Sequence, residues 1–159
     1  MGRGNLIRFA AVLAGALAAV ASATAATGVR WSPLFSGATE PRGSQAAVGY
    51  IAVTRTQERI WSGRLTADDR AALGRVNLTR NAVVAVFLDG MPCGSHLTTE
   101  AVTRTSPTTL HVRLAYTRPP PGVAMCVRTS TPYFGLTISR QSLGRPAPTH
   151  VTVDAHARA

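Results

Sequence analysis

The chain has 159 residues and a formal net charge of +10, because 17 basic residues outnumber 7 acidic ones. Hydrophobic residues make up 45% of the chain, which excludes a wholly disordered protein. Every basic residue is arginine, and the arginines are scattered without a block and without interleaved aromatic residues. We therefore expect no nucleic acid as a partner, because single-stranded nucleic acid is bound by aromatic platforms along a basic groove. A module that binds acidic polymers is disfavoured by the same scatter.

The first 26 residues are typical of a bacterial secretion signal. Arg3 and Arg8 give a positive start, residues 9–20 are an uncharged apolar run, and small residues follow at the spacing that a signal peptidase reads. The apolar run is shorter than the roughly 20 residues that a membrane-spanning helix needs. We therefore predict a cleaved signal peptide at 1–26, export by the general secretory route, and a mature chain without a membrane span. Its expected location is the extracytoplasmic cell envelope or the medium.

Beyond the signal, the sequence predicts one domain with flexible ends. Residues 27–45 are rich in Gly, Ser, Pro and Thr, which predicts a flexible lead-in, and the proline-bearing residues 144–159 predict a flexible tail. The intervening residues 46–143 are long enough for one β-rich domain. We expect this domain to be a monomer on its own.

The domain begins with a predicted strand and a short helix. Residues 46–54 have the period-two pattern of a strand. Residues 56–63 predict a helix that Thr56 caps. Its apolar residues Ile60 and Trp61 are both expected to face inward.

A second helix is predicted at residues 65–74. Thr66 fits the N-cap position, and Asp68 and Asp69 lie beside the positive end of the helix dipole. Gly74 is expected to form the C-terminal cap. Because Asp68 and Asp69 are adjacent on a helix, they cannot converge on one bond as the paired carboxylates of glycosidases do.

The remainder of the domain predicts strands. Residues 82–88 are a continuous apolar run, which predicts a central strand buried on both faces. Further strands are predicted at 97–103, 110–116, 123–129 and 133–139, separated by turns that include 106–107, 119–122 and 131–132. The five strands would form a meander. We predict a mainly β (α+β) fold, an antiparallel β-sandwich or open barrel with one or two short helices after the first strand.

The two cysteines, Cys93 and Cys126, are predicted to form a disulfide. An exported chain enters an oxidising compartment, where an even number of thiols usually pairs. Closing this loop would stabilise the fold by roughly 3–4 kcal/mol in the chain-entropy model. The alternative is a reactive thiol, with Cys93 as nucleophile and His96 as base.

The sequence offers little catalytic chemistry. No group of His, Cys, Asp and Glu has the spacing of a metal site, so we expect no metal and no cofactor. Gly94, Ser95 and His96 lack the GxSxG spacing of a serine nucleophile elbow. We therefore expect no enzyme activity, with a hydrolase that uses Ser95 or Cys93 as the less favoured alternative.

The order of segments resembles the C-terminal domain of the PrcB family, a subunit of a secreted bacterial protease complex. The resemblance covers residues 46–139 and rests on the runs at 58–61, 76–78, 83–90, 91–96, 118–122 and 129–134. The chain departs from the family pattern at Asn77, Ser95 and His96. The resemblance implies an accessory domain that binds protein, such as a secreted protease, and has no activity of its own.

Two proline-rich and glycine-rich loops are the predicted binding surface. They also look distantly like the loops of chagasin-type cysteine-protease inhibitors, which is the alternative function. Loops at one end of a rigid β scaffold commonly carry binding. The candidate partner-binding residues are Met91, Pro92, Gly94, Ser95, His96, Pro119, Pro120, Pro121, Gly122, Pro132 and Tyr133.

Overall fold

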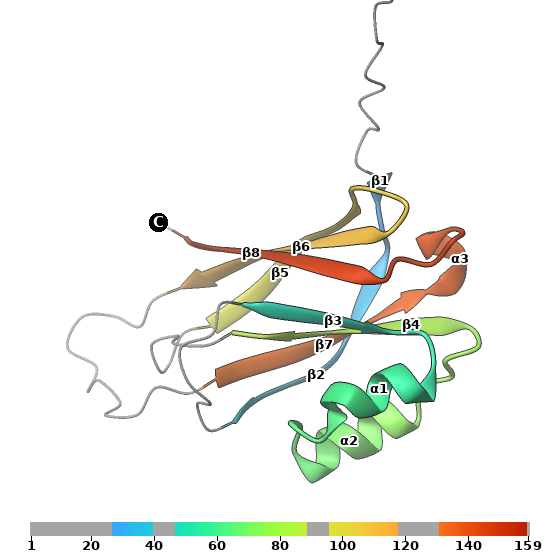
Figure 1. The fold of residues 1–159 in the computed structure, drawn as a ribbon. Helices are drawn as coiled ribbons and strands as arrows, with labels where there is room; N and C mark the ends of the chain where they lie inside the picture. The colour runs from blue at the N-terminus through green and yellow to red at the C-terminus, as the bar shows by residue number, and fades with distance from the viewer. Residues whose placement is uncertain (1–26, 40–46, 89–95, 118–130, 159) are drawn as a thin grey trace, which may run out of the picture.

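The computed structural model describes residues 27–39, 47–88, 96–117 and 131–158. Their elements, in chain order, are β1 (Thr27–Gly28), β2 (Trp31–Thr39), β3 (Val48–Ala52), α1 (Arg55–Ser62), α2 (Ala67–Gly74), β4 (Asn81–Phe87), β5 (His96–Arg104), β6 (Thr109–Thr117), β7 (Thr131–Ser139), α3 (Arg140–Leu143) and β8 (His150–Ala157) (Figure 1). The signal segment and the predicted strand at 123–129 lie outside the described residues.

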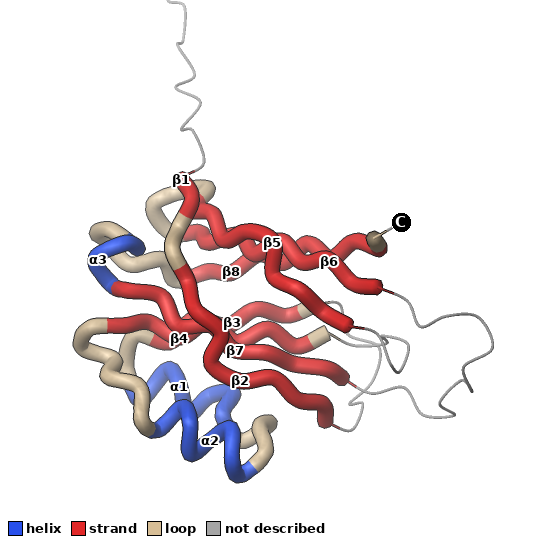
Figure 2. The backbone as a smooth tube through the Cα atoms, turned by 180° about the vertical axis from the view of Figure 1, so that it is seen from behind, coloured by secondary structure: helices blue, strands red, loops and turns tan. Residues whose placement is uncertain are grey.

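Two four-stranded sheets pack face to face. The β5 sheet has the order β1-β5-β6-β8, and the β4 sheet has the order β2-β7-β4-β3. Helices α1 and α2 cover the outer face of the β4 sheet, so the described residues form three layers (Figures 1 and 2). This arrangement confirms the predicted mainly β fold with few short helices, although α1 and α2 follow the third strand and not the first. It is a sandwich, because neither sheet closes into a barrel within the described ranges.

Strand β4 lies at the centre of the molecule and is buried on both faces, as its apolar run predicts. It pairs with β3 on one side and with β7 on the other. Its alternate residues Ala82, Val84 and Val86 pack between the two sheets. The intervening residues Val83, Ala85 and Phe87 pack against the helices. The continuous apolar run is therefore explained by two separate cores, one on each face of the strand.

Helix α1 has its N-cap two residues earlier than predicted. Thr54, not Thr56, is the N-cap, because Gln57 stands three residues later and completes a capping box with it. The expectation that two apolar residues face inward is half right. Trp61 is 1% exposed, whereas Ile60 is 75% exposed. Adjacent helical positions point about 100° apart, so only one side chain of the pair reaches the core.

Helix α2 has the predicted N-cap. The Thr66 hydroxyl accepts a hydrogen bond from the backbone of Asp69. Gly74 is the last helical residue, and Arg75 takes the C-cap position in a right-handed conformation that needs no glycine. Within the described ranges, no helix has the length and apolarity needed to cross a membrane.

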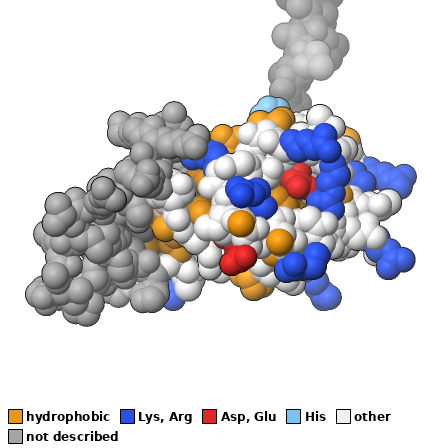
Figure 3. Space-filling model, turned by 90° about the horizontal axis from the view of Figure 1, so that it is seen from below, with side chains coloured by type: hydrophobic (Ala, Val, Ile, Leu, Met, Phe, Trp, Pro, Cys, Tyr) orange, Lys and Arg blue, Asp and Glu red, His pale blue; other side chains and the backbone are white. Residues whose placement is uncertain are grey.

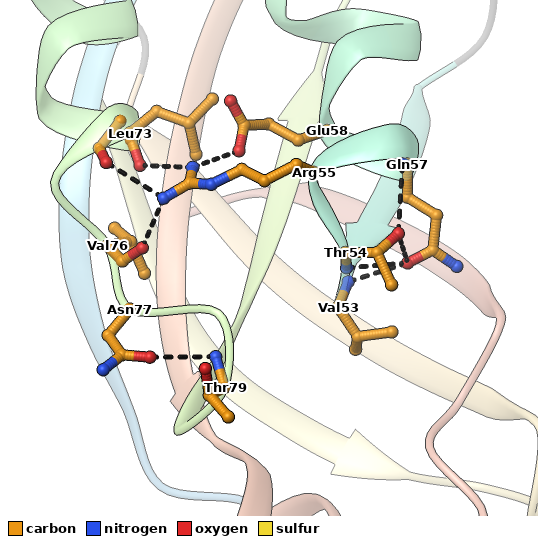
Figure 4. Close-up of polar contacts among 10 residues, drawn as sticks. Val53, Thr54, Arg55, Gln57, Glu58, Leu73, Val76, Asn77 and Thr79 are labelled. Atoms are coloured by element: carbon orange, nitrogen blue, oxygen red, sulfur yellow. Dashed lines mark hydrogen bonds and ion pairs between the residues drawn. The ribbon is translucent and has the colours of Figure 1, made fainter.

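Arg55 joins the two helices. From the first residue of α1, its guanidinium donates to the carbonyl oxygens of Leu73 at 3.2 Å, Gly74 at 2.9 Å and Val76 at 2.7 Å (Figure 4). The guanidinium also contacts the Glu58 carboxylate. The last carbonyl groups of a helix lack partners within the helix. One side chain therefore joins the start of α1 to the carbonyl groups at the end of α2.

The structure differs from the predicted flexible lead-in. Within residues 27–45, the segment Trp31–Thr39 forms β2 and pairs with β7 along its length. Phe35 is 8% exposed, and its ring lies over Gly135 on the neighbouring strand. Pro33 is compatible with this strand because β2 is at the edge of the β4 sheet, where a missing N–H group costs no ladder bond.

The structure also differs from the predicted flexible tail. His150–Ala157 forms β8, which pairs in parallel with β6 and so completes the β5 sheet. Val151, Val153 and Ala155 face inward and pack against the core between the sheets. Their alternation with exposed polar residues is the pattern of a half-buried strand, which the neighbouring prolines obscured.

The strands do not form a meander. Among the described strands, β5 and β6 are consecutive and paired, whereas β7 lies between β2 and β4. The turn predicted at 131–132 is wrong, since both residues belong to β7 and the carbonyl oxygen of Pro132 accepts from Leu88. Thr131 and Pro132 are therefore the first two residues of a strand. The proline stands at the start of this strand and does not separate two strands.

Candidate functional site

The described residues contain only part of the predicted binding surface. Met91, Pro92, Gly94, Ser95, the run 119–122 and both cysteines lie outside the described ranges. The backbone of His96 begins β5, and Pro132 and Tyr133 belong to β7. The predicted pairing of Cys93 with Cys126 stays a prediction.

The described strands nevertheless show where these segments start and finish. Thr39 pairs with Thr131, Val48 pairs with Phe87, and His96 pairs with Thr117. Ladder partners are about 5 Å apart. The strand ends that flank segments 40–47, 88–95 and 118–130 therefore lie at one end of the sandwich (Figures 1 and 2). We call it the Thr131 end.

Tyr133 is not part of an accessible loop. It is 1% exposed, and its hydroxyl donates to Asp69 Oδ2 at 2.5 Å and accepts from the backbone N–H of Thr66 at 3.2 Å. Burial, followed by the hydrogen bond to the Asp69 carboxylate, raises the pKa of Tyr133 above its ordinary value of 10.0. This residue attaches the start of α2 to the β4 sheet and belongs to the buried core beneath the Thr131 end.

An arginine and three aromatic rings form the helical side of the Thr131 end. The guanidinium carbon of Arg64 lies 4.0 Å from the centroid of the Phe87 ring, within the range of a cation–π contact. The centroid of the Phe87 ring also lies 5.9 Å from that of Tyr50 and 5.7 Å from that of Tyr133. The Nε atom of Arg64 is buried without a hydrogen-bond partner, and no described carboxylate pairs with this side chain. Among the described residues, the Arg64 guanidinium is positioned by its contact with the Phe87 ring.

The described residues hold no assembled catalytic or metal centre. In the part of the chain that the structure covers, no group of three His, Cys, Asp or Glu residues could hold a metal ion. Two threonine–histidine hydrogen bonds occur, Thr152 with His111 at 3.0 Å and Thr149 with His150 at 2.9 Å. Both lie on exposed strand surface, and neither histidine pairs with a described carboxylate. A triad needs that third group to orient the base.

Sequence reasoning missed Arg64 and Asp69 as neighbours of the Thr131 end. Asp69 was assigned only to the helix dipole, although its side chain reaches a tyrosine 64 positions away. No local pattern in the sequence reports such a long-range pair. No protein-family model, no curated protein and no solved structure matches this chain. The function of this chain is therefore inferred only from the geometry of its described residues and from its sequence motifs.

Proposed function

We propose that this protein is an exported, non-enzymatic accessory domain that binds a protein partner, such as a secreted protease, through its Thr131 end. The observation that supports the proposal is the meeting of three strand-end pairs at that end: Thr39 with Thr131, Val48 with Phe87, and His96 with Thr117. The candidate residues in segments 88–95 and 118–130 thereby have their chain attachments next to one another.

The scaffold beneath these attachments is rigid. Strand β4 has a packed core on each face, and Tyr133 is bonded to the start of α2. Segments that connect strands on such a scaffold are the usual carriers of binding, because the scaffold limits the entropy that is lost when a partner is bound. Segments 40–47, 88–95 and 118–130 together comprise about as many residues as one side of a standard protein interface, roughly 20–30.

The proposal is tested with two sets of variants at opposite ends of the sandwich. The mature chain is used as bait in culture fluid and envelope extract, the captured protein is purified, and its affinity is measured by titration. The double variant Met91→Glu and Pro120→Glu should weaken binding by at least about tenfold, because buried unpaired charge is costly at an interface. The control is Pro107→Glu in the exposed β5–β6 turn, at the other end, which should bind like the wild type.

Two results would contradict the proposal. One is equal affinity of the double variant and the control variant for the purified partner. The other is catalysis: turnover of a substrate by the purified chain, with labelling by a serine-directed or cysteine-directed probe that Ser95→Ala or Cys93→Ala abolishes. If the partner is a cysteine protease and loses activity on titration, the chagasin-like alternative describes the function.

A further inference from the structure

A polar pocket lies at the opposite end of the sandwich from Thr131. Its volume is about 540 Å³, and α3 and the following turn form much of its lining. β7 ends there, since Ser139 pairs with Asn81 at the start of β4. The polar side chains that line it are Thr79, Arg140, Gln141 and Arg145. None of the lining residues is acidic.

The two arginines of this pocket have no carboxylate partner among the described residues, unlike Arg55, Arg113 and Arg158. Glu58 pairs with Arg55, and Glu100 pairs with both Arg113 and Arg158. Within the described ranges, Arg140 and Arg145 make no ion pair. Figure 3, which views the molecule from the helical side, shows several basic side chains and few acidic ones on that face. The pocket is therefore a place of uncompensated positive charge.

A third arginine fixes the wall of the pocket. Arg104 donates from Nε to Ser106 at 3.1 Å and from its terminal nitrogens to the carbonyl oxygens of Pro107, Leu143 and Pro146. The last two acceptors flank Gly144 and Arg145. Gly144 has a φ of 72°, and a Cβ atom there would lie 2.6 Å from Arg104. The turn is thus held in one conformation by contacts that leave Arg145 free for a ligand.

The opposite wall is also fixed. The Asn77 side chain accepts from the backbone N–H of Thr79 at 2.9 Å and so holds the turn before β4 (Figure 4). Arg140 donates one hydrogen bond, from a terminal nitrogen to the Leu78 carbonyl oxygen at 3.4 Å, and its backbone N–H bonds to Arg80 at 2.8 Å. A guanidinium has five N–H donors, so most of those on Arg140 remain available.

We propose that this pocket binds a phosphate group of a phosphorylated ligand. Two guanidinium groups line the pocket, and a guanidinium suits the charge and the paired oxygens of a phosphate, while the Thr79 hydroxyl and the Gln141 amide add neutral donors. The volume exceeds the roughly 30 Å³ of one water molecule many times over, so the phosphate can carry part of a larger molecule. Its source is either a free phosphorylated small molecule or a phosphate-bearing polymer of the cell envelope. The pocket lies at the end away from the proposed protein partner, so the two proposals are independent.

The test measures binding of inorganic phosphate, glycerol 3-phosphate and poly(glycerol phosphate) to the mature chain by calorimetry and by chemical-shift titration. Arg145→Gln should weaken binding of each probe that binds by at least about tenfold, because it removes charge-assisted hydrogen bonds. The matched control is Arg59→Gln, which removes the same charge from an exposed position on α1 and should change the affinity less than about twofold. Arg145 makes no side-chain hydrogen bond within the described residues, so its replacement leaves the fold intact.

The outcomes separate the two sources and can overturn the proposal. Tight binding of glycerol 3-phosphate without a gain for the polymer indicates a small-molecule ligand, whereas a large gain for the polymer indicates an envelope polymer. Equal weakening by Arg145→Gln and Arg59→Gln means attraction by net charge alone, and the proposal then fails. It also fails if none of the three probes binds saturably, or if the shifted amide signals lie outside α3 and the turns at 77–80 and 143–147.

Discussion

At the scale of the residue, the close approach of β2 to β7 depends on an absent side chain. A Cβ atom at Gly135 would lie 2.3 Å from the Phe35 ring, which is far inside van der Waals contact. The ring therefore packs directly on the backbone of β7 and closes the core beside the helices. Pairing of an aromatic residue with a glycine across two strands cannot be inferred until the register of the strands is known.

We expect Gly135→Ala to destabilise the protein by about 1–3 kcal/mol, the usual cost of overpacking a core. The measurement is the free energy of unfolding in urea. The control is Gly63→Ala, where a Cβ atom meets nothing within 4 Å. If Phe35→Leu does not recover part of the loss in the double variant, the ring contact is not the cause.

Tyr133→Phe should destabilise the protein by about 1–3 kcal/mol at neutral pH, because the partly buried Asp69 carboxylate and the Thr66 N–H group lose a partner. The variant should also change the pH dependence. The pKa of Tyr133 is raised in the folded state, so its stabilising contribution is complete below about pH 10 and is lost as the pH rises above that value. The decline of stability above pH 10 should therefore be shallower in Tyr133→Phe.

Chemical denaturation between pH 8 and pH 11 measures this decline (roughly one unit or more on either side of the tyrosine value). Tyr116→Phe is the control, because Tyr116 makes no hydrogen bond through its hydroxyl within the described residues. Parallel pH curves for the wild type and Tyr133→Phe would show that the proton of this phenol is not linked to folding.

At the scale of the element, α1 and α2 behave as one unit because Arg55 bonds to three carbonyl oxygens at the end of α2. The sequence predicted α2 and its Thr66 cap, since capping signals lie within one turn of the helix. It did not predict the contact between the helices, which joins residues about 20 positions apart. Local sequence patterns therefore predict elements and their ends, whereas contacts between elements can be known only from the three-dimensional structure.

Arg55→Met should lower the free energy of unfolding by about 1–3 kcal/mol, because it removes the guanidinium donor from the partly buried carbonyl oxygen of Val76 and from the end of α2. Relative to the wild type, the variant should show a larger increase in the rate of amide hydrogen exchange in the last turn of α2 than in β4. Arg59→Met, on an exposed position of the same helix, should change stability by less than about 0.5 kcal/mol. Equal effects of the two substitutions on the free energy of unfolding would contradict the role of Arg55 in joining α1 to α2.

At the scale of the whole molecule, the fold class could be predicted and the topology could not. The apolar run of β4 and the alternation of β6 identified a central strand and a half-buried strand, because burial is written into those patterns. Strands β2 and β8 come from segments with prolines, and β7 is inserted between strands that are distant in sequence. The arginine-lined pocket depends on the same long-range pairing, since Ser139 pairs with Asn81 beside it, and it could not be predicted either.

Two substitutions at neighbouring residues test whether β8 is a packed strand of the sandwich. Val153→Asp should cost at least about 3 kcal/mol, since it places a charge between the sheets. Thr152→Asp, on the exposed face, should cost less than about 1 kcal/mol. Thermal unfolding of both variants is the measurement. Small and equal effects would mean that residues 150–157 are a tail and not a strand of the sandwich.

The two ends of the described chain lie at opposite ends of the sandwich. Thr27 pairs with Arg104, close to the turn that Arg104 holds, whereas Arg158 donates its backbone N–H to Tyr116 beside the Thr131 end (Figure 1). A tether or tag attached ahead of Thr27 therefore presents the Thr131 end outward, toward solution. The same tag after Arg158 stands beside that end and would compete with the proposed partner. Immobilisation on the side of Thr27 is thus the orientation that leaves the Thr131 end accessible to the proposed partner.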